Sequence, residues 1–380
     1  MFVFAITQIT GYVAHDPTWT RLAQGIAILA ALWFVWSAYA WLGNTAASDE
    51  GAVRVVLLAA MGAMFVLSLA VPTAFGSGGL AFGIAFLVVR CLHLSAYTIL
   101  AREDPTMRVV VARLARTMLP AAVLLLAAGI VGGSARWPLW IAALTVDYGG
   151  LVVGGVEGWR IEPAHFAERH GLVIIIALGE SIVSLGVGAT GVGLGAGIIV
   201  GGLLGVTVAA AMWWAYFDVV ALVAERRLRG ADGRERALMA RDSYTYLHLP
   251  MVGGIVLFAV GVKKMLVHES AHLPAVPAVC LCGGLALYFL ALSGLKRRNI
   301  GSFNYPRLVA TALLAAFSPL ALHVPALLAL ALVAACACGL IGYEVVRYAG
   351  ARDRIRHGER ALVELVEERE PAALQGDPAS

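Results

Sequence analysis

Charged residues are scarce in this sequence. Asp, Glu, Lys and Arg make up 14% of its 380 residues, whereas a soluble domain contains about 25%. Hydrophobic residues make up 60%, and the mean hydropathy is +0.83. A soluble fold of this size has too little interior for so much apolar surface, so the composition excludes the soluble, disordered and disulfide-rich classes. The sequence predicts a polytopic membrane protein.

Cysteine and the common enzyme motifs are equally sparse. The chain has five cysteines, all in apolar segments, and two Cys-x-Cys pairs fall on predicted helices, where residues i and i+2 point about 200° apart. Neither pair is therefore expected to chelate one metal ion, and we predict no metal site and no cofactor. No nucleophile elbow, P-loop, dinucleotide fingerprint or zincin motif is present.

The net charge of +4 has no nucleic-acid signature, because no basic segment is interleaved with stacking aromatic residues. We expect no nucleic-acid partner. The expected partners are the lipid bilayer and a small ion or small-molecule substrate, and the sequence leaves open whether the chain forms a homo-oligomer.

Long apolar segments account for most of the chain. They run for about 20 residues without alternation, which predicts helices and not the strands of an outer-membrane barrel. We therefore predict an all-α transmembrane bundle of about 12 helices, at residues 1–14, 19–42, 52–71, 79–100, 107–132, 136–158, 167–188, 196–224, 238–262, 274–295, 307–323 and 325–348. The first segment would span only about 21 Å of a core of about 30 Å. This favours a start that cuts into a longer helix over a partly re-entrant helix.

The basic residues predict an orientation. Of the 28 Lys and Arg residues, 23 fall in alternate loops and the C-terminal tail, and four fall in the opposite loops. Basic loops remain on the cytoplasmic side of a membrane. We expect both termini to be cytoplasmic in a bacterial inner membrane.

An internal repeat is visible. One offset of 187 residues pairs Pro138 with Pro325, and Glu157 with Glu344. Six helices per half would give the two halves the same orientation, a parallel repeat as found in several transporter folds. We predict a first six-helix repeat at 1–160, a second at 161–350 and a charged cytoplasmic tail at 351–380, with chance similarity between apolar helices as the alternative.

Four ionisable residues lie well inside predicted helices: Arg90, Asp147, Glu180 and Asp218. Such residues are costly in a bilayer and are usually paired or functional. Arg90 and Asp147 both lie near the middle of their helices, and His93 shares the face of Arg90. We predict either a structural Arg90–Asp147 ion pair or a gate or substrate-carboxylate site that uses Arg90.

Glu180 lies at the centre of its helix, where no cation is close in sequence. Gly179 allows close backbone approach, and Ser181 and Ser184 add hydroxyl groups. A desolvated carboxyl of this kind is suited to carry a proton or to bind a cation, and the alternative is a neutral Glu that hydrogen-bonds across a helix interface. Gln8 takes the matching place in the first repeat and cannot titrate.

Aromatic residues surround Asp218 in the segment WWAYFD (213–218), which includes Tyr216. The pattern is typical of an interfacial aromatic belt, and we expect Asp218 either to snorkel to the membrane surface or to pair near Arg226 and Arg227. Farther along, Tyr244, Tyr246 and His248 form a polar strip, and at most two of the three are expected to face one cavity, because alternate residues on a helix diverge.

A polar segment, 162–170, leads into the seventh predicted helix. It contains His165, Glu168, Arg169 and His170, which we predict to form a cytoplasmic motif. His165 and Arg169 share a helix face, but the spacing of the His and Glu residues matches no established metal-ligand pattern.

Four segments carry a family resemblance. FVFAITQIT at 2–10, HFAERHGLVIIIALGESIV at 165–183, WWAYFD at 213–218 and YLHLPMVGGIVLFAVGVK at 246–263 resemble the bacterial low-temperature-requirement protein A (LtrA) family. The resemblance runs to about residue 350 and implies a multi-pass inner-membrane protein linked to growth in the cold. Family members usually carry an acidic E-L-F-x-D-L segment before FVFA, and this chain begins after it.

We expect a transporter or channel-like permease in which Glu180 carries a proton or coordinates a cation, with Arg90, His93 and Asp147 as the partner cluster. An integral-membrane enzyme acting on lipid, which is less favoured, and a non-transporting scaffold or sensor are the alternatives. Water-accessible polar groups at mid-membrane would favour the permease. A lipid-filled groove at 157–170 would favour the enzyme, and a dry, fully paired interior would favour the scaffold.

Overall fold

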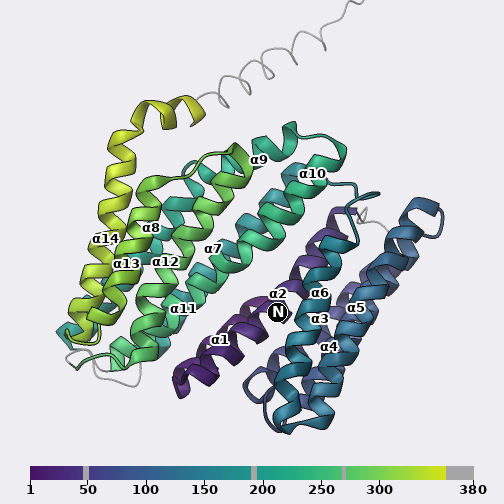
Figure 1. Ribbon diagram of the computed structural model, residues 1–380, viewed down its shortest axis with the longest axis horizontal. Coiled ribbons are helices and arrows are strands. Elements are labelled where there is room, and N and C mark those ends of the chain that lie inside the picture. The colour runs from purple at the N-terminus through teal and green to yellow at the C-terminus, as the bar shows by residue number, and fades with distance from the viewer. Residues whose placement is uncertain (46–50, 190–194, 268–270, 357–380) are drawn as a thin grey trace, which may run out of the picture.

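The computed structural model describes residues 1–45, 51–189, 195–267 and 271–356, and these residues form an all-α bundle (Figure 1). Eight of its segments are long and apolar enough to cross a membrane. The helices are α1 (Phe2–His15), α2 (Trp19–Thr45), α3 (Gly51–Ala70), α4 (Gly79–Leu100), α5 (Pro105–Val131), α6 (Arg136–Val153), α7 (Pro163–Ala189), α8 (Ala196–Phe217), α9 (Val220–Gly230), α10 (Gly233–Met239), α11 (Leu247–Val267), α12 (Ala275–Ile300), α13 (Tyr305–Leu320) and α14 (Ala326–Arg347), with short 3₁₀ turns η1 (Val71–Thr73) and η2 (Gly133–Ala135) and a π-helix η3 (Ala240–Tyr246). The predicted helical membrane bundle is confirmed.

Three predicted segments end differently in the structure. The segment 196–224 breaks at Asp218 into α8 and the short α9, where the buried side chain of Asp218 pairs with Arg352 and Arg356 beyond α14. The segment 238–262 consists of α10, η3 and α11. The segment 136–158 ends at Val153, because Gly154 caps α6 and Gly155 adopts a positive φ of 74°.

The helices form two groups with a central seam (Figure 1). Helices α3 to α6 pack together on one side, and α8 with α12 to α14 pack on the other. Between them, α1 and α2 contact α7 and α11. The parallel repeat of 1–160 and 161–350 stays a prediction, and the predicted tail, 351–380, lies outside the described residues beyond Arg356.

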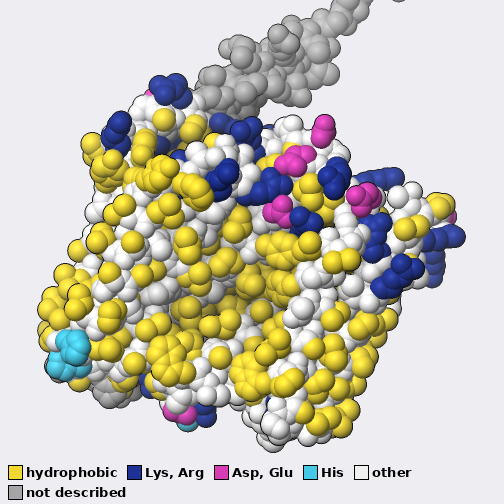
Figure 2. Space-filling model, in the orientation of Figure 1, with side chains coloured by type: hydrophobic (Ala, Val, Ile, Leu, Met, Phe, Trp, Pro, Cys, Tyr) yellow, Lys and Arg dark blue, Asp and Glu magenta, His cyan; other side chains and the backbone are white. Residues whose placement is uncertain are grey.

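Lys and Arg side chains gather at one end of the bundle, above a broad belt of hydrophobic side chains (Figure 2). This end holds the 154–162 segment, α9 and α10. The alternation of basic loops along the sequence thus becomes a spatial separation in the fold. Which side of the membrane this end faces stays a prediction.

A single residue joins α2 to η3. Thr245 accepts hydrogen bonds at its carbonyl oxygen from Trp33 Nε1 (2.7 Å) and at its Oγ1 from Ser37 Oγ (3.1 Å) and Trp41 Nε1 (2.9 Å). A π-helix holds one extra residue per turn and is common at functional positions. Here it places Thr245 toward α2 and the neighbouring Tyr244 among the residues of α7 and α11.

Candidate functional site

Arg90 on α4 and Asp147 on α6 form an ion pair in the interior of the first helix group. Their side chains are only 1% and 3% exposed. The guanidinium of Arg90 also lies over the rings of Phe34 and Phe86, whose centroids are 5.2 and 5.0 Å from Cζ. The predicted ion pair is therefore present, and cation–π contacts supplement it.

The pair is not fully hydrogen-bonded. Arg90 Nε and Nη1 and Asp147 Oδ1 are buried and have no hydrogen-bond partner among the described residues. Buried polar groups are nearly always paired, and a buried ion pair compensates for its desolvation only if its remaining donors and acceptors are satisfied. These atoms therefore need water, an ion or a solute that the protein itself does not supply.

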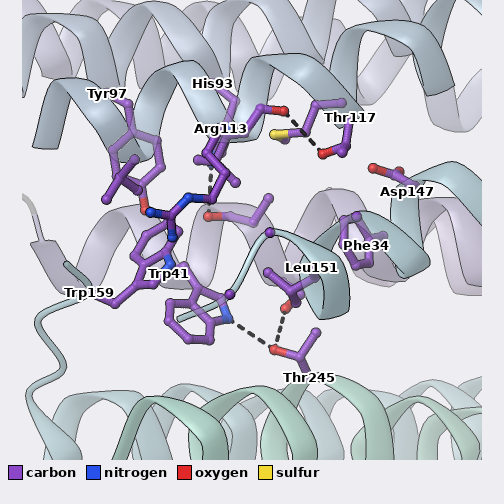
Figure 3. A pocket seen from close by; sticks show the side chains of 18 residues that line it. Phe34, Trp41, His93, Tyr97, Arg113, Thr117, Asp147, Leu151, Trp159 and Thr245 are labelled. Atoms are coloured by element: carbon purple, nitrogen blue, oxygen red, sulfur yellow. Dashed lines mark hydrogen bonds between the residues drawn. The ribbon is translucent and has the colours of Figure 1, made fainter. Parts of the chain in front are cut away.

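A small cavity, whose lining is mostly apolar but includes several polar side chains, lies beside Asp147 (Figure 3). It has a volume of about 40 Å³ and is enclosed by α2, α4, α5, α6, η3 and the segment after α6. A cavity needs about 10–15 Å³ to hold one water, so this one has room for about three. Its polar lining comes from Ser37, His93, Arg113, Thr117, Asp147 and Thr245.

His93 joins Asp147 at this cavity, as the sequence predicts for the partner cluster. Its Nε2 lies 3.0 Å from the carbonyl oxygen of Ala38, and its ring meets Tyr39 and Tyr97 edge-on at 5.1 and 5.0 Å between centroids. His93 Nδ1 is buried and has no hydrogen-bond partner within the described ranges. A second side chain at this site thus has an unused hydrogen-bonding atom.

Arg113 lines the same cavity from α5 and is 27% exposed (Figure 3). Its Nη1 donates to the carbonyl oxygen of Glu157 (3.3 Å) and lies 3.7 Å from Glu157 Oε2. The backbone N–H of Glu157, followed by the charges of Arg234 and Arg113, lowers the pKa of its exposed carboxyl. Since Glu157 lies in the segment 154–162, the cavity lies directly below the basic end of the bundle.

Glu180 lies apart from this cluster. It is 7% exposed, and Ser184 Oγ of the same helix donates to its Oε1 at 3.1 Å. Ser181 instead donates to the carbonyl oxygen of Leu178 (2.7 Å), and no hydrogen bond joins Gln8 to Glu180 in the part of the chain that the structure describes. Glu180 does not line the cavity beside Asp147, nor three other well-formed cavities among the described residues. Its functional role stays a prediction.

The predicted cytoplasmic motif does not converge on one point. His165 and Glu168 are exposed, with side chains 71% and 67% accessible and 3.7 Å between His165 Nδ1 and Glu168 Oε2. Arg169 donates to the carbonyl oxygens of Ala40 (3.0 Å) and Gly43 (2.9 Å) and so caps the end of α2. His170 does not join these residues at the surface, because its side chain is fully buried inside the bundle.

His170 instead belongs to a buried cluster with Tyr216, Tyr244 and His248. The ring of His248 lies 5.2 Å from that of His170 and stacks on Tyr244 at 5.2 Å. Both ring nitrogens of His248 are bonded, Nδ1 to the carbonyl oxygen of Ser243 and Nε2 to the hydroxyl of Tyr216, each at 2.8 Å. His170 Nε2 and the Tyr244 hydroxyl have no hydrogen-bond partner among the described residues.

The prediction for Asp218 is wrong in its partners. Asp218 pairs with Arg352 and Arg356, beyond α14, and not with Arg226 or Arg227. Arg226 donates to the carbonyl oxygen at position 355 (2.7 Å). The chain after α14 folds over the corner between α8 and α9. Arginines that are distant in sequence therefore contact Asp218 in place of those that are close to it in sequence.

The sequence analysis missed one buried pair. Arg307 of α13 contacts Glu344 of α14 through two hydrogen bonds, Nε to Oε1 and Nη2 to Oε2, each 2.8 Å. Asn304 Nδ2 adds a third to Glu344 Oε1 at 2.9 Å. The shared Arg-Leu at 113–114 and 307–308 and the Glu157–Glu344 correspondence were the available signals, because Arg113 and Glu157 also meet.

Comparison with known proteins gives the same outline as the fold. Residues 1–342 match the family model described as bacterial low temperature requirement A protein (LtrA). The chain is also 28% identical over 330 residues to the uncharacterized protein RA0937 of Rhizobium meliloti, covering 83% of this chain and 79% of that protein. No solved structure matches significantly. The family match and the eight apolar helices make this a multi-pass membrane protein, and the chain belongs to the LtrA family.

Proposed function

We propose that this protein is a permease that moves protons or small ions across the bilayer through the site at Arg90 and Asp147. One observation carries the proposal, which is that this ion pair is buried, that its carboxylate lines a small internal cavity, and that three of its polar atoms remain without a partner among the described residues. Intramembrane ionisable groups with incomplete pairing are typical of ion and proton pathways.

The geometry gives the site two electrostatic states. In the structure, Asp147 neutralises Arg90. A proton on Asp147 would remove that attraction and leave Arg90 as an uncompensated cation, which then favours an anion or rearranged water in its place. Proton uptake is thereby linked to a change in what Arg90 binds. The cavity of about 40 Å³ admits only species of the size of a few waters in this conformation.

Glu180 is a second carboxylate at which coupling can occur. Its burial and its single hydroxyl donor, Ser184, support a group that exchanges a proton. It lacks the cavity that Asp147 has. We therefore place the first test on Asp147 and retain Glu180 as the alternative position.

The other two functional classes have less support. An enzyme acting on lipid would need His165, Glu168 and His170 to converge, and the exposed pair lies apart from the buried histidine. A scaffold would need a dry and fully paired interior. The Arg307–Glu344 pair fits that description, whereas Arg90 and Asp147 do not.

The transport test uses purified protein in liposomes with an internal pH dye, an imposed membrane potential and a panel of cations. We expect proton flux in the wild type and its loss in Asp147→Asn. Asp16→Asn is the matched control, because Asp16 is 54% exposed and pairs with Arg21 outside the cavity. Glu180→Gln is measured alongside. Equal flux in wild type and Asp147→Asn, or no flux in the wild type under any condition, would overturn the proposal.

We further propose that the basic end of the bundle is cytoplasmic, in a bacterial inner membrane. The gathering of Lys and Arg at that end supports this orientation (Figure 2). In a cysteine-free background, Gly230→Cys and Ala372→Cys should resist a membrane-impermeant maleimide in intact cells. Ser134→Cys, in an exposed turn of the opposite loops, should react. The reverse labelling pattern would invert the orientation.

A further inference from the structure

A groove runs along the outer face of the second helix group. It lies mainly between α13 and α14 and has a volume of about 880 Å³. At one end it extends past the start of α13 to Phe303, Asn304 and Lys296. Along it, Val309, Leu313 and Leu332 are exposed by 57%, 60% and 44%. Hydrophobic side chains cover this part of the molecule in Figure 2. The groove is therefore an apolar surface that faces the surroundings of the bundle.

The length of the groove matches one leaflet of a bilayer. Its lining follows α13 from Tyr305 to Phe317, which is about 18 Å at 1.5 Å per residue. Half of a hydrocarbon core of about 30 Å is about 15 Å. Aromatic side chains at the basic end, namely Phe303, Tyr305 and Tyr348, mark the level at which lipid headgroups begin.

A second cavity of about 210 Å³, which has more charged side chains in its lining than the groove and is called the polar cavity below, adjoins the groove at this end. Lys296, Asn304 and Tyr348 line both. Lys296 has no carboxylate partner among the described residues, since its Nζ contacts only the carbonyl oxygen of Phe303 at 3.4 Å. Its charge is therefore available at the junction of the apolar groove and the polar cavity.

Positive charge exceeds negative charge around this junction. Besides Lys296, Arg307 and Arg352 line the polar cavity, and Arg356 lies close by through its pair with Asp218. The nearby carboxylates, Glu344 and Asp218, are paired with these arginines, as given above. Of the three cations that line the polar cavity, Arg307 and Arg352 are each paired with a carboxylate, which leaves the charge of Lys296 available to an anion.

We propose that this groove binds one anionic glycerophospholipid, with its acyl chains along α13 and α14 and its phosphate at Lys296. Acyl chains fit an apolar channel of one-leaflet length, and basic pockets between membrane helices bind acidic headgroups. The site is separate from the cavity at Asp147, with which it shares no residue.

The headgroup is tested by native mass spectrometry of delipidated protein titrated with phosphatidylglycerol or phosphatidylcholine of the same acyl chains. We expect phosphatidylglycerol to bind more tightly, and Lys296→Gln to weaken its binding about fivefold, since one basic residue near an anionic headgroup contributes a factor of that order. Lys264→Gln, at the opposite end of the bundle, is the matched control and should leave binding unchanged.

The acyl-chain channel is tested by filling it. A Cβ added at Gly339, which lines the groove, would meet no heavy atom within 4 Å, and the same holds for a Cβ at Gly342 of the same helix, which does not line it. Both Gly→Leu changes therefore fit the fold. Gly339→Leu should lower the number of retained lipids from one to none, and Gly342→Leu should not.

Three results would overturn the proposal. Equal binding of the two lipids would show that the headgroup is not recognised. Equal lipid retention in the two Gly→Leu variants would show that the acyl chains do not occupy the groove. A dimer in the wild-type spectrum that is lost in Gly339→Leu would show that a second copy of the chain occupies the groove. Loss of proton flux is not a readout here, so the lipid site and the proposed permease function can fail independently.

Discussion

Arg307 with Glu344 and Arg90 with Asp147 are both buried ion pairs that join two neighbouring helices, one in each helix group. In the first pair, both carboxylate oxygens accept from the guanidinium, and Asn304 adds a third bond. In the second, a single guanidinium nitrogen contacts a single oxygen, and the other polar atoms face a cavity or aromatic rings.

The difference separates two uses of the same residue types. A bidentate pair with its remaining lone pairs bonded compensates for its own desolvation and fixes the packing of two helices. A pair with unbonded atoms does not, and its contribution to stability is correspondingly smaller. Such a pair keeps part of its desolvation penalty uncompensated. This is expected where the charged group must be available to bind a solute. The comparison therefore assigns Arg307–Glu344 to helix packing, and it agrees with the proposal that Arg90–Asp147 serves transport.

The largest effect is expected at the fully bonded pair. Arg307→Gln leaves Glu344 buried without its cation and should lower the free energy of unfolding by about 3–5 kcal/mol. The double variant Arg307→Gln/Glu344→Gln should recover less than half of that, because the bidentate geometry is lost with the charges. Denaturant titration in detergent measures the loss. A cost below about 1 kcal/mol would remove the contrast between the pairs.

The Arg90–Asp147 pair should behave differently in the same cycle. Arg90→Gln and Asp147→Asn should each destabilise by about 3 kcal/mol, and the double change should recover more than half of one single loss, since neutral side chains no longer leave a buried charge. If the loss of stability in the double variant equals the sum of the losses in the two single variants, these residues are not energetic partners, although they are in contact.

A smaller difference is expected inside the histidine cluster. His248→Leu strands the Tyr216 hydroxyl and loses the bond to the Ser243 carbonyl, whereas His170→Leu removes a ring whose Nε2 has no partner in the described chain. We expect His248→Leu to be less stable than His170→Leu by about 1–3 kcal/mol. Thermal unfolding of the two variants side by side is the measurement, and equal midpoints would contradict it.

The smallest effect is expected for Glu157, the counterpart of Glu344 in the predicted repeat. Its carboxylate is exposed and lies 3.7 Å from Arg113, so Glu157→Gln should barely change the unfolding midpoint. Because its pKa is lowered in the folded protein, the small stabilisation is present at neutral pH and is lost as the pH falls through that lowered pKa. A midpoint that drops as far as in Glu344→Gln would contradict the comparison.

Much of the fold followed from the sequence because apolar length is a direct physical requirement of a membrane span. The segments 19–42 and 79–100 begin where α2 and α4 begin. The breaks at Asp218 and in η3 did not follow, since no Pro or Gly lies at either position to signal an interruption of the helix. They depend on contacts with Arg352 and with Trp33, which are 134 and 212 residues away in sequence.

The candidate site was predictable only in part. Two opposite charges near the middle of their helices were enough to pair Arg90 with Asp147. The sequence did not bring His170 and His248 together, because His170 lies near the helix start, among exposed polar residues, and only its buried face distinguishes it. The sequence analysis favoured Glu180 over Asp147 as the proton or cation site, because a sequence shows whether a cation lies nearby along the chain. It does not show whether a cavity lies beside the side chain.

The junction at Thr245 also constrains how the two helix groups can move. Trp33, Ser37 and Trp41 are spaced four residues apart, so their backbones extend along about 12 Å of α2 while their side chains converge on one residue. Sliding α2 in one direction stretches the bond from Trp33, and sliding it in the other stretches the bond from Trp41. Rotation about Thr245 disturbs them least. By this geometry, we expect the contact at Thr245 to resist translation of α2 along η3 in both directions and to tolerate a change in the angle between them more easily.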